Sequence, residues 1–459
     1  MLKVFSPYDR QLIKEIKDNT LEEAHDVLQK AHALFIDQAK WLPAHQRIEI
    51  LERTAALMKN KIEELTNIAA QEGGKPYIDS KIEVERAINS VKIAAEYISQ
   101  IKGEQIPMEL NKASMNRIAF TTKEPIGVVF SICAFNHPLN LVVHQTATAI
   151  AAGCPVIIKP ATSTPLSCLN FIEILKEAGL PTGWCETIVC NNEVAEKIAG
   201  DTRINYLSFI GSAKVGWYLR SKLAPGTRCG LEHGGAAPVI VEADAAIDEL
   251  IPAMVKGGFY HAGQVCVSVQ RIFVHEHIID TVAAQVTAGA KKLIVGDPLD
   301  KKTEVGPLIS PKEVDRVHEW VQEAVAHGAK LLCGGNKISN TCYEPTVLLN
   351  PPANVRVSTS EIFGPVVCIY SYNDLDKAIN TANNLDLHFQ SAVFTKNIDT
   401  ALYCIKKLNA TAVMVNDHTA FRVDWMPFGG RDASGLGLGG IPYTINEMLR
   451  EKMMVVKYK

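Results

Sequence analysis

The sequence predicts an α/β protein with two α/β domains, and three observations support this prediction. From residue 126 onward, short apolar segments alternate with segments whose apolar residues recur at helical spacing. The alternation resumes after the apolar segment 238–241 and continues to residue 416. No internal repeat or low-complexity linker interrupts it. Apolar strands that alternate with helices indicate parallel sheets covered by helices on both faces.

Composition and charge narrow the functional class. The chain has 459 residues, of which 47% are hydrophobic and 21% charged, and its formal net charge is -3. The length predicts roughly two to four domains. The near-neutral balance excludes the basic surface of a nucleic-acid-binding or anionic-membrane-binding protein. The N-terminus lacks an apolar signal core, and the longest apolar run, 126–135, is too short to span a bilayer.

The cysteines indicate the redox environment. There are 11 of them, and none forms a CxxC pair. This pattern argues against a disulfide framework and against a structural zinc site. We therefore expect no metal centre and a reducing, cytoplasmic location.

Periodicity gives the elements in chain order. Helices are expected over 12–39, 43–71 and 82–98, followed by an exposed strand over 117–123. The first α/β domain is expected to hold strands 126–132, 155–159, 186–190 and 204–210, with helices 139–152, 165–178 and 193–199 between them. The second is expected to hold a helix over 247–256 and strands over 271–274, 366–370, 391–394 and 412–416. Residues 453–459 are expected to form a terminal strand.

Two strand ends carry chemistry that a nucleotide would need. Lys159 closes the predicted strand 155–159, and Gly211–Ser212 lies between the strand 204–210 and the next helix. Ligands of parallel sheets bind beyond the carboxyl ends of the strands, and free N–H groups at a helix N-terminus favour phosphate. The GxGxxG fingerprint is absent. From the pattern alone, a solvated strand end and a simple turn remain equally good interpretations.

Cys266 and Glu232 are candidates for catalysis. Cys266 lies on a glycine-flanked loop before a strand, where reactive residues tend to be held by rigid elements. Glu232 ends a strand just before a pair of glycines, and a partly desolvated carboxylate there could act as a general base. Taken singly, each residue is better explained as structural, the cysteine as a small buried apolar side chain and the glutamate as a turn acid.

Seven motifs together make the chain similar to the aldehyde dehydrogenase superfamily. They occur in that family's order, with 34 positions between Glu232 and Cys266 and 23 between Asn136 and Lys159. The motifs are Phe135-Asn136-His137-Pro138, Ile158-Lys159-Pro160, Phe209-Ile210-Gly211-Ser212, Leu231-Glu232-His233-Gly234-Gly235, Gly263-Gln264-Val265-Cys266, Glu361-Ile362-Phe363-Gly364-Pro365 and Pro427-Phe428-Gly429-Gly430. The resemblance is greatest to the subgroup of lactaldehyde, succinate-semialdehyde and phosphonoacetaldehyde dehydrogenases.

The resemblance implies a thioester mechanism. Cys266 would attack the aldehyde, and the side-chain amide of Asn136 with the Cys266 N–H would hold the oxyanion. Glu232 would activate the water that hydrolyses the thioester, and its presence favours release of a free acid. NADP or NAD would accept the hydride.

The resemblance also assigns cofactor contacts. Lys159 would bind the adenosine ribose, Gly211 and Ser212 the pyrophosphate, and Glu361 the nicotinamide ribose, with Phe363 nearby. Three positions after the lysine, relatives that prefer NAD usually carry a glutamate, whereas this chain has Thr162. Threonine can hydrogen-bond a 2′-phosphate that a carboxylate would repel, so we expect NADP to be accepted.

Departures from the family indicate the substrate. Positions that are commonly aromatic in relatives acting on apolar aldehydes carry His137, His144 and Arg422, close to Phe428 in the expected tunnel. We therefore expect a short, polar, anionic aldehyde, whose carboxylate, sulfonate or phosphonate the Arg422 guanidinium could bind with two hydrogen bonds. The alternative is that Arg422 pairs with Asp424 and that the histidines are structural. Arg271 and Arg117 are further candidates for the anion site.

By the same resemblance, the chain would form three parts. These are a dinucleotide-binding domain over 1–105 and 126–234, a catalytic domain over 235–433, and an oligomerisation element over 106–125 and 434–459. A homodimer or homotetramer is expected.

Two further departures from the family are visible. The chain starts later than most relatives, and we expect it to lack their N-terminal hairpin. His233 stands in place of a usual leucine and could alter the pKa of Glu232.

Three competing functions remain at this stage. A CoA-acylating aldehyde dehydrogenase would pass the acyl group to a thiol rather than to water. A catalytically silent structural member of the fold would need none of the three catalytic residues. A cysteine hydrolase using Cys266 and His261 is a more distant possibility that would leave the nucleotide site without a purpose.

Overall fold

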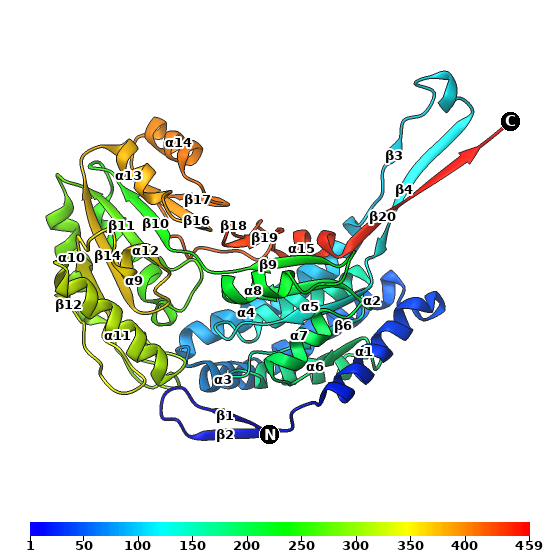
Figure 1. Cartoon of the computed structure of the whole chain (residues 1–459), viewed down its shortest axis with the longest axis horizontal. Coiled ribbons are helices and arrows are strands. Elements are labelled where there is room, and N and C mark those ends of the chain that lie inside the picture. Colours follow the sequence, from blue (N-terminus) through cyan, green and yellow to red (C-terminus); the bar gives the residue numbers. More distant parts are fainter.

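The computed structural model describes residues 1–459 and has two α/β lobes and a projecting arm (Figure 1). The first lobe is built on a six-stranded sheet in the order β19-β9-β8-β5-β6-β7. Five strands are parallel and β19 is antiparallel. The strands are β5 (Val128–Ile132), β6 (Val156–Lys159), β7 (Cys185–Thr187), β8 (Ile204–Ile210), β9 (Arg228–Glu232) and β19 (Gly435–Leu436).

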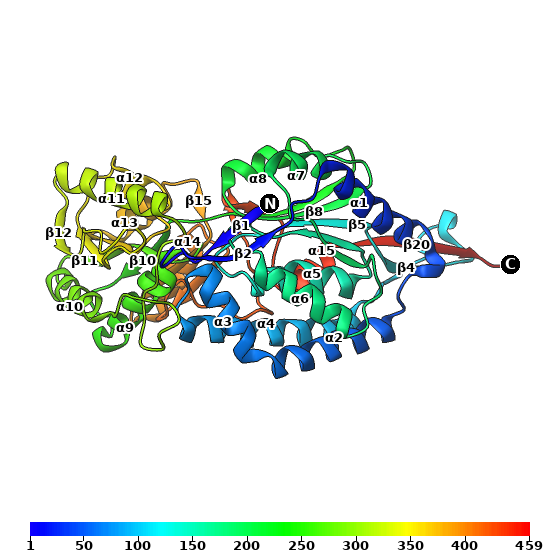
Figure 2. The same cartoon turned by 90° about the horizontal axis from the view of Figure 1, so that it is seen from below.

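Helices cover both faces of this sheet (Figure 2). One face carries the largest apolar core, to which α2 (Ala44–Asn60), α3 (Ile62–Gly73), α4 (Tyr77–Tyr97), α5 (Asn140–Ala152), α6 (Leu166–Glu177) and α15 (Ile441–Glu447) contribute. The other face packs on α1 (Leu21–Ile36), α7 (Asn192–Ala199) and α8 (Ala213–Arg220). The predicted parallel sheet covered on both faces is confirmed.

The second lobe is built on a seven-stranded sheet in the order β12-β13-β14-β11-β10-β16-β17. All neighbours are parallel except β12. The strands are β10 (Ala237–Val241), β11 (Val269–His275), β12 (Lys330–Cys333), β13 (Thr346–Leu349), β14 (Val366–Tyr372), β16 (Gln390–Phe394) and β17 (Ala412–Val415). The helices are α9 (Ile247–Phe259), α10 (Ile279–Lys292), α11 (Pro311–Ala326), α12 (Arg356–Thr359), α13 (Leu375–Ala382) and α14 (Ile398–Lys407).

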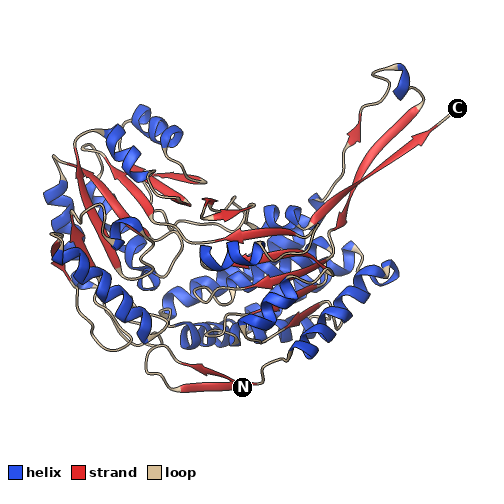
Figure 3. Ribbon diagram, viewed as in Figure 1, coloured by secondary structure: helices blue, strands red, loops and turns tan.

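A three-stranded antiparallel arm extends away from the lobes (Figure 3). It consists of β3 (Gln105–Ile106), β4 (Arg117–Pro125) and β20 (Leu449–Lys457). Of the predicted element 434–459, only β20 lies in the arm. The strand β19 joins the first lobe's sheet, and Ile441, Ile445 and Met448 are buried in that lobe's core, because the amphipathic α15 must cover its apolar face.

The N-terminus differs from the sequence prediction. The hairpin that we expected to be missing is present as β1 (Leu2–Phe5) and β2 (Leu12–Ile16). The turn between these strands contacts the second lobe, where the Thr341 hydroxyl donates to the Tyr8 carbonyl. The predicted helix 12–39 starts only at Leu21, because Thr20 caps it in a box with Glu23. The predicted helix 43–71 is two helices, which break at Lys61.

A small two-stranded antiparallel sheet also links the second lobe to the glycine-rich segment after Phe428, where β15 (Leu387–His388) pairs with β18 (Arg431–Asp432). Short 3-10 turns lie at Gln38–Lys40, Ile98–Gln100, Lys112–Ser114 and Tyr260–Gly263. No helix is both long and apolar enough to cross a membrane.

Candidate active site

Cys266 lies on the loop between α9 and β11, at the junction of the lobes. The loop contains left-handed residues at His261 (φ 49°), Ala262 (φ 53°) and Gly263 (φ 69°). A Cβ at Gly263 would overlap the Gly364 carbonyl, so only glycine fits there. The tight turn leaves the Cys266 side chain half-buried and held between rigid elements.

Asn136 reaches the same loop from the first lobe. Its side chain is 6% exposed, and its Nδ2 donates to the Gln264 carbonyl at 2.9 Å. Because Gln264 is two residues before Cys266, this bond holds the amide beside the thiol. Asn136, from the first lobe, is therefore tied directly to the loop that carries Cys266.

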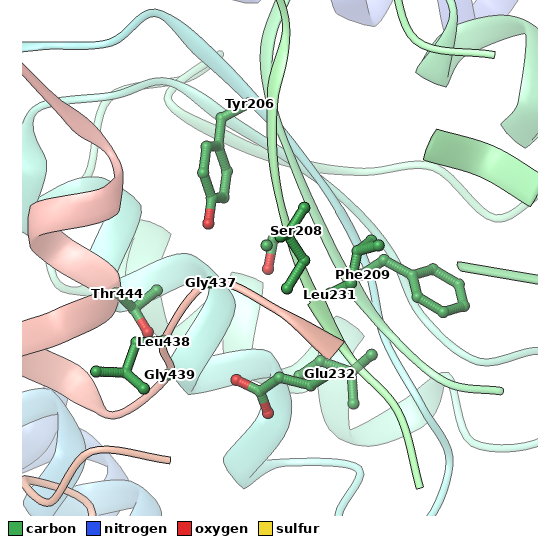
Figure 4. A pocket seen from close by; sticks show the side chains of 12 residues that line it. Tyr206, Ser208, Phe209, Leu231, Glu232, Gly437, Leu438, Gly439 and Thr444 are labelled. Atoms are coloured by element: carbon green, nitrogen blue, oxygen red, sulfur yellow. The ribbon is translucent and has the colours of Figure 1, made fainter. Parts of the chain in front are cut away.

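Glu232 is the last residue of β9, and its carboxyl group faces a polar pocket of about 300 Å³. Figure 4 shows the hydroxyl groups of Tyr206, Ser208 and Thr444 around this pocket with the Glu232 carboxylate. A Cβ at Gly439 would overlap that carboxylate. Burial raises the pKa of Glu232, and the nearby Arg422 guanidinium opposes the rise. A carboxyl group with this environment suits a general base.

The charges that act on the Cys266 thiol come from Arg422, Glu361 and Glu232, which indicates that these side chains belong to one site. Burial raises the pKa of Cys266 to about 12, whereas the charge of Arg422 lowers it and the charges of Glu361 and Glu232 raise it further. Such mutual effects require the four side chains to lie near one another. In the free protein, Cys266 is therefore a protonated thiol at neutral pH that needs a base.

The predicted dinucleotide residues lie at strand ends of the first lobe. Lys159 ends β6 and is 5% exposed; its Nζ donates only to the Pro160 carbonyl at 3.4 Å. Thr162 follows on the exposed loop before α6. Gly211 and Ser212 join β8 to α8, and the Ser212 side chain does not cap that helix. A buried cation without an anion and an uncapped helix N-terminus fit a phosphate-bearing dinucleotide.

Glu361 and Phe363 approach from the second lobe. The Gly235 N–H donates to Glu361 Oε1 at 3.2 Å, and burial raises the Glu361 pKa to about 8. Phe363 has a left-handed backbone (φ 48°) and packs edge-on against Phe135, with 5.8 Å between ring centroids. Both residues line a second pocket of about 210 Å³ beside the Cys266 loop, together with Gly235, Gly263, Val265, Gln270 and Gly364. The structure thus brings them to the nucleophile.

Arg422 is held over Phe428, with its guanidinium carbon 3.5 Å from the ring centroid. Its Nη2 lies 3.4 Å from His144 Nδ1, and its buried Nε has no hydrogen-bond partner. The alternative, in which Arg422 pairs with Asp424, is not what the structure contains. Asp424 instead binds Arg86 and His144. The Arg422 cation therefore lies in the site without a carboxylate bound to it.

The remaining substrate candidates separate into two groups. His137 is half-buried in the site, with its Nε2 3.4 Å from the Tyr260 hydroxyl. Arg271 is buried among backbone carbonyls and donates to those of Ala236, Thr381 and Ala382. Arg117 lies on the arm and donates to the carbonyls of Ala113 and Met115. Backbone carbonyls occupy all three nitrogens of the Arg271 guanidinium, and Arg117 lies on β4 of the arm, so neither arginine contributes to an anion site beside Cys266.

Two further histidines take structural places. His233 packs between Phe209 and Trp217, and its Nδ1–H donates to the Gly211 carbonyl at 3.0 Å. The pKa of Glu232 is set by its burial and by Arg422, without a contribution from His233. Both ring nitrogens of His261 are buried without a hydrogen-bond partner, so no Cys266–His261 pair exists to support a cysteine hydrolase.

Sequence reasoning did not identify Arg86 and Glu83, which lie on α4 beside the site. Glu83 accepts from the N–H groups of Leu139 and Asn140 and so fixes the start of the helix after Asn136. A signal was available: Glu83, Ala87 and Ser90 follow helical spacing on a buried face. A charged residue on such a face requires a partner elsewhere in the fold.

The whole chain matches known proteins. The model of the aldehyde dehydrogenase family matches residues 1–454. A 3-sulfolactaldehyde dehydrogenase of Priestia aryabhattai is 38% identical over 457 residues, which cover 99% of this chain and 94% of that protein. A lactaldehyde dehydrogenase of Methanocaldococcus jannaschii is 38% identical over 460 residues, which cover 99% and 97%.

Solved structures agree with these matches. The structure of aldehyde dehydrogenase 21 from Physcomitrella patens in complex with the reaction product succinate has a TM-score of 0.96 and 37% identity, covering 99% of this chain and 95% of that one. Glyceraldehyde-3-phosphate dehydrogenase from Methanocaldococcus jannaschii complexed with NADP has a TM-score of 0.95 and 37% identity, covering 100% and 99%. With the fold and the Cys266 site described above, these matches establish that the chain belongs to the aldehyde dehydrogenase family, whose members are oxidoreductases acting on aldehydes.

Proposed function

We propose that this protein oxidises a short anionic aldehyde to the carboxylic acid with NADP or NAD as the hydride acceptor. Cys266, Glu232 and Asn136 carry the chemistry, and Arg422 binds the anionic end of the substrate. The single observation that supports this substrate class most strongly is the Arg422 guanidinium, which lies beside the thiol with a buried Nε that no group accepts from.

The chain's own residues account for the steps. Cys266 gives its proton to Glu232, which releases it to solvent, and the sulfur adds to the aldehyde carbon, while Asn136 and the Cys266 N–H donate to the resulting oxyanion. Bound cofactor supplies the hydride acceptor, and the adduct thereby becomes a thioester. Glu232 removes a proton from the attacking water, and the acid leaves as Cys266 regains its proton. The pocket beside Glu232 offers hydroxyl groups that can hold water there.

Lys159, Thr162 and Ser212 would hold the adenosine half of the cofactor. The absence of a carboxylate at position 162 favours NADP, whose 2′-phosphate a neighbouring carboxylate would repel. Glu361 and Phe363 would hold the nicotinamide half close to Cys266. The NADP complex of the similar glyceraldehyde-3-phosphate dehydrogenase supports this choice of cofactor.

The relatives support the substrate class. One acts on 3-sulfolactaldehyde, and another was crystallised with succinate. Both molecules carry an anion a few atoms from the reacting carbon. A guanidinium that offers two parallel donors binds a carboxylate or a sulfonate well.

A substrate comparison tests the proposal. The value of kcat/KM is measured for succinate semialdehyde and for propanal, in the wild type and in Arg422→Leu. We expect the variant to raise KM for succinate semialdehyde at least about tenfold more than for propanal, because a hydrogen bond to a charged group is lost only with the anion. Equal effects on both aldehydes would exclude Arg422 as the anion site. Acid formation without added CoA separates hydrolysis from acyl transfer.

Assembly and location complete the proposal. The arm leaves the outer edge of β20 unpaired and exposes apolar side chains, which supports association with a second copy of the chain.

All 11 cysteines are free thiols, which suits a reducing compartment, and we propose the cytoplasm.

A further inference from the structure

A chain of polar contacts runs from α4 to Arg422. Arg86 binds Asp424 with two hydrogen bonds, from Nη2 to Oδ1 at 2.7 Å and from Nε to Oδ2 at 3.1 Å. Asp424 Oδ1 lies 2.8 Å from His144 Nε2, and His144 Nδ1 lies 3.4 Å from Arg422 Nη2. Asp424 and His144 are 2% and 5% exposed. These four residues form the Arg86–Asp424–His144–Arg422 chain.

The contacts determine the tautomer of His144. An ionised carboxylate has only acceptors, so the His144 nitrogen facing Asp424 must carry a proton. A guanidinium has only donors, so the nitrogen facing Arg422 must be bare. His144 is therefore neutral and protonated at Nε2. The lowering of its pKa to about 4, chiefly by burial, agrees with a neutral ring at physiological pH.

Asp424 remains ionised in this arrangement. Its pKa lies well below the usual range despite its burial, because His144 hydrogen-bonds it and Arg86 and Arg422 are positively charged. Asn140 Nδ2 also donates to it at 3.3 Å. Asp424 makes its ion pair with Arg86 and its hydrogen bond with neutral His144, so no carboxylate is hydrogen-bonded to Arg422 and its donors can bind a ligand.

We propose that Asp424 and His144 are positioning residues for anion selectivity: Asp424 fixes the tautomer of His144, and the bare Nδ1 of His144 then anchors one nitrogen of Arg422 so that its other donors point at the substrate's anion. This inference rests on the proposed function of Arg422. It replaces the substrate contact predicted for His144 by an indirect role. Selectivity would then depend on Asp424, which the substrate does not touch.

Two substitutions test the chain without changing Arg422. In His144→Gln, the amide can still donate to Asp424 from the position of Nε2, but no acceptor remains at the position of Nδ1. In Asp424→Asn, one of the Arg86 donors faces an NH₂ group, and the charge that fixes the tautomer is gone. For both variants we expect the ratio of kcat/KM for succinate semialdehyde to that for propanal to fall by about tenfold, mainly through KM.

A matched control uses the same chemistry elsewhere. His388 Nδ1 and Asp432 Oδ2 are 2.7 Å apart on the two-stranded β15–β18 sheet, and neither residue is hydrogen-bonded to Arg422. Asp432→Asn should leave the ratio within about twofold of the wild type, since no donor to the anion moves. A comparable fall of the ratio in this control would show that the effect is not specific to the chain and would overturn the inference.

The outcomes separate the inference from the function. If Arg422→Leu lowers the ratio but His144→Gln and Asp424→Asn keep it within about twofold, the positioning role is wrong and the anion site stands. If Arg422→Leu itself leaves the ratio unchanged, the proposed substrate class fails. Nitrogen NMR of histidine-labelled protein gives a second readout: a His144 signal protonated at Nε2 alone is expected, and protonation at Nδ1 overturns the inference.

Discussion

At the scale of single residues, burial disfavours the charged forms of the two candidate reactive groups. Burial raises the pKa of both the Cys266 thiol and the Glu232 carboxyl, and each is partly offset by Arg422. A protonated thiol is a poor nucleophile, which protects it until substrate and cofactor change its surroundings. The Arg422 charge therefore acts on both members of the proposed catalytic pair, Cys266 and Glu232, as well as on its proposed ligand.

The thiol's raised pKa predicts a steep pH dependence of alkylation. For a thiol with a pKa of about 12, the thiolate fraction rises about tenfold with each unit increase in pH, as long as the pH stays below the pKa. We therefore expect the rate of Cys266 alkylation by iodoacetamide to rise about tenfold per unit between pH 7 and pH 9. Peptide mass spectrometry measures it, with Cys266→Ser identifying the peptide. A rate that levels off below pH 8 would contradict the prediction.

A single side chain should set cofactor preference. In Thr162→Glu, a carboxylate would stand on the exposed loop next to Lys159, where the 2′-phosphate of NADP is expected. Like charges brought together in a binding site are strongly unfavourable. We expect kcat/KM with NADP to fall at least about tenfold while kcat/KM with NAD changes little. A wild type that prefers NAD tenfold would refute the role of Thr162.

At the scale of elements, two buried carboxylates set the positions of the loops that bear function. Glu72 on α3 accepts from the N–H groups of Leu166 and Ser167 at the start of α6, which follows the Lys159 loop. Glu83 on α4 does the same at the start of α5, which follows Asn136. A carboxylate at a helix N-terminus meets unsatisfied donors and the positive end of the dipole. Helices α3 and α4, through Glu72 and Glu83, thus fix the loop after Lys159 and the loop after Asn136.

Removing the charge of Glu83 should destabilise the fold. Its second oxygen pairs with Lys75, and both side chains are fully buried. In Glu83→Gln, the amide oxygen can still accept from α5, but an NH₂ group would face the buried ammonium. Breaking one partner of a buried pair typically costs about 3–5 kcal/mol. The matched control is Glu177→Gln, whose pair with Lys61 is exposed and should matter by less than about 1 kcal/mol in urea unfolding.

At the scale of the whole molecule, the arm has no partner within its own chain. Strand β20 pairs with β4 on one side only, along nine residues from Leu449 to Lys457. In this register Val456 lies opposite Ile118, and these side chains are 53% and 52% exposed. An open strand edge with exposed apolar side chains is a typical site for association of identical chains.

Charges on the arm should prevent assembly. If the arm mediates the proposed association, we expect Ile118→Lys combined with Val456→Lys to give monomers in sedimentation velocity, because two ammonium groups would have to be desolvated at that interface. The control replaces Ile398 and Leu402 by lysine on α14, which are equally apolar and exposed but outside the arm. That control should assemble like the wild type. A wild type that sediments as a monomer would contradict the prediction.

Much of the architecture follows from local patterns. The strand 204–210 and the boundaries of α5 and β6 could be predicted to within a residue, because buried parallel strands are short apolar runs between helical segments. The N-terminal hairpin could not, because β2 is short and half-exposed, with a periodicity too brief to separate from the helix after it. The place of α15 was missed since its apolar face needs a core that only the folded first lobe supplies.

The sequence alone predicted the fold class and the family and named the proposed catalytic trio, since each depends on residue types in a fixed order along the chain. Only the tertiary structure decided how the charges are paired. In the folded protein, Asp424 is hydrogen-bonded to Arg86 and His144 rather than to Arg422. Arg271 lies among backbone carbonyls, and Glu83 accepts hydrogen bonds at the start of α5. The physical reason is that a buried charge binds whichever opposite group the packing brings within about 3 Å, and sequence distance does not limit that choice.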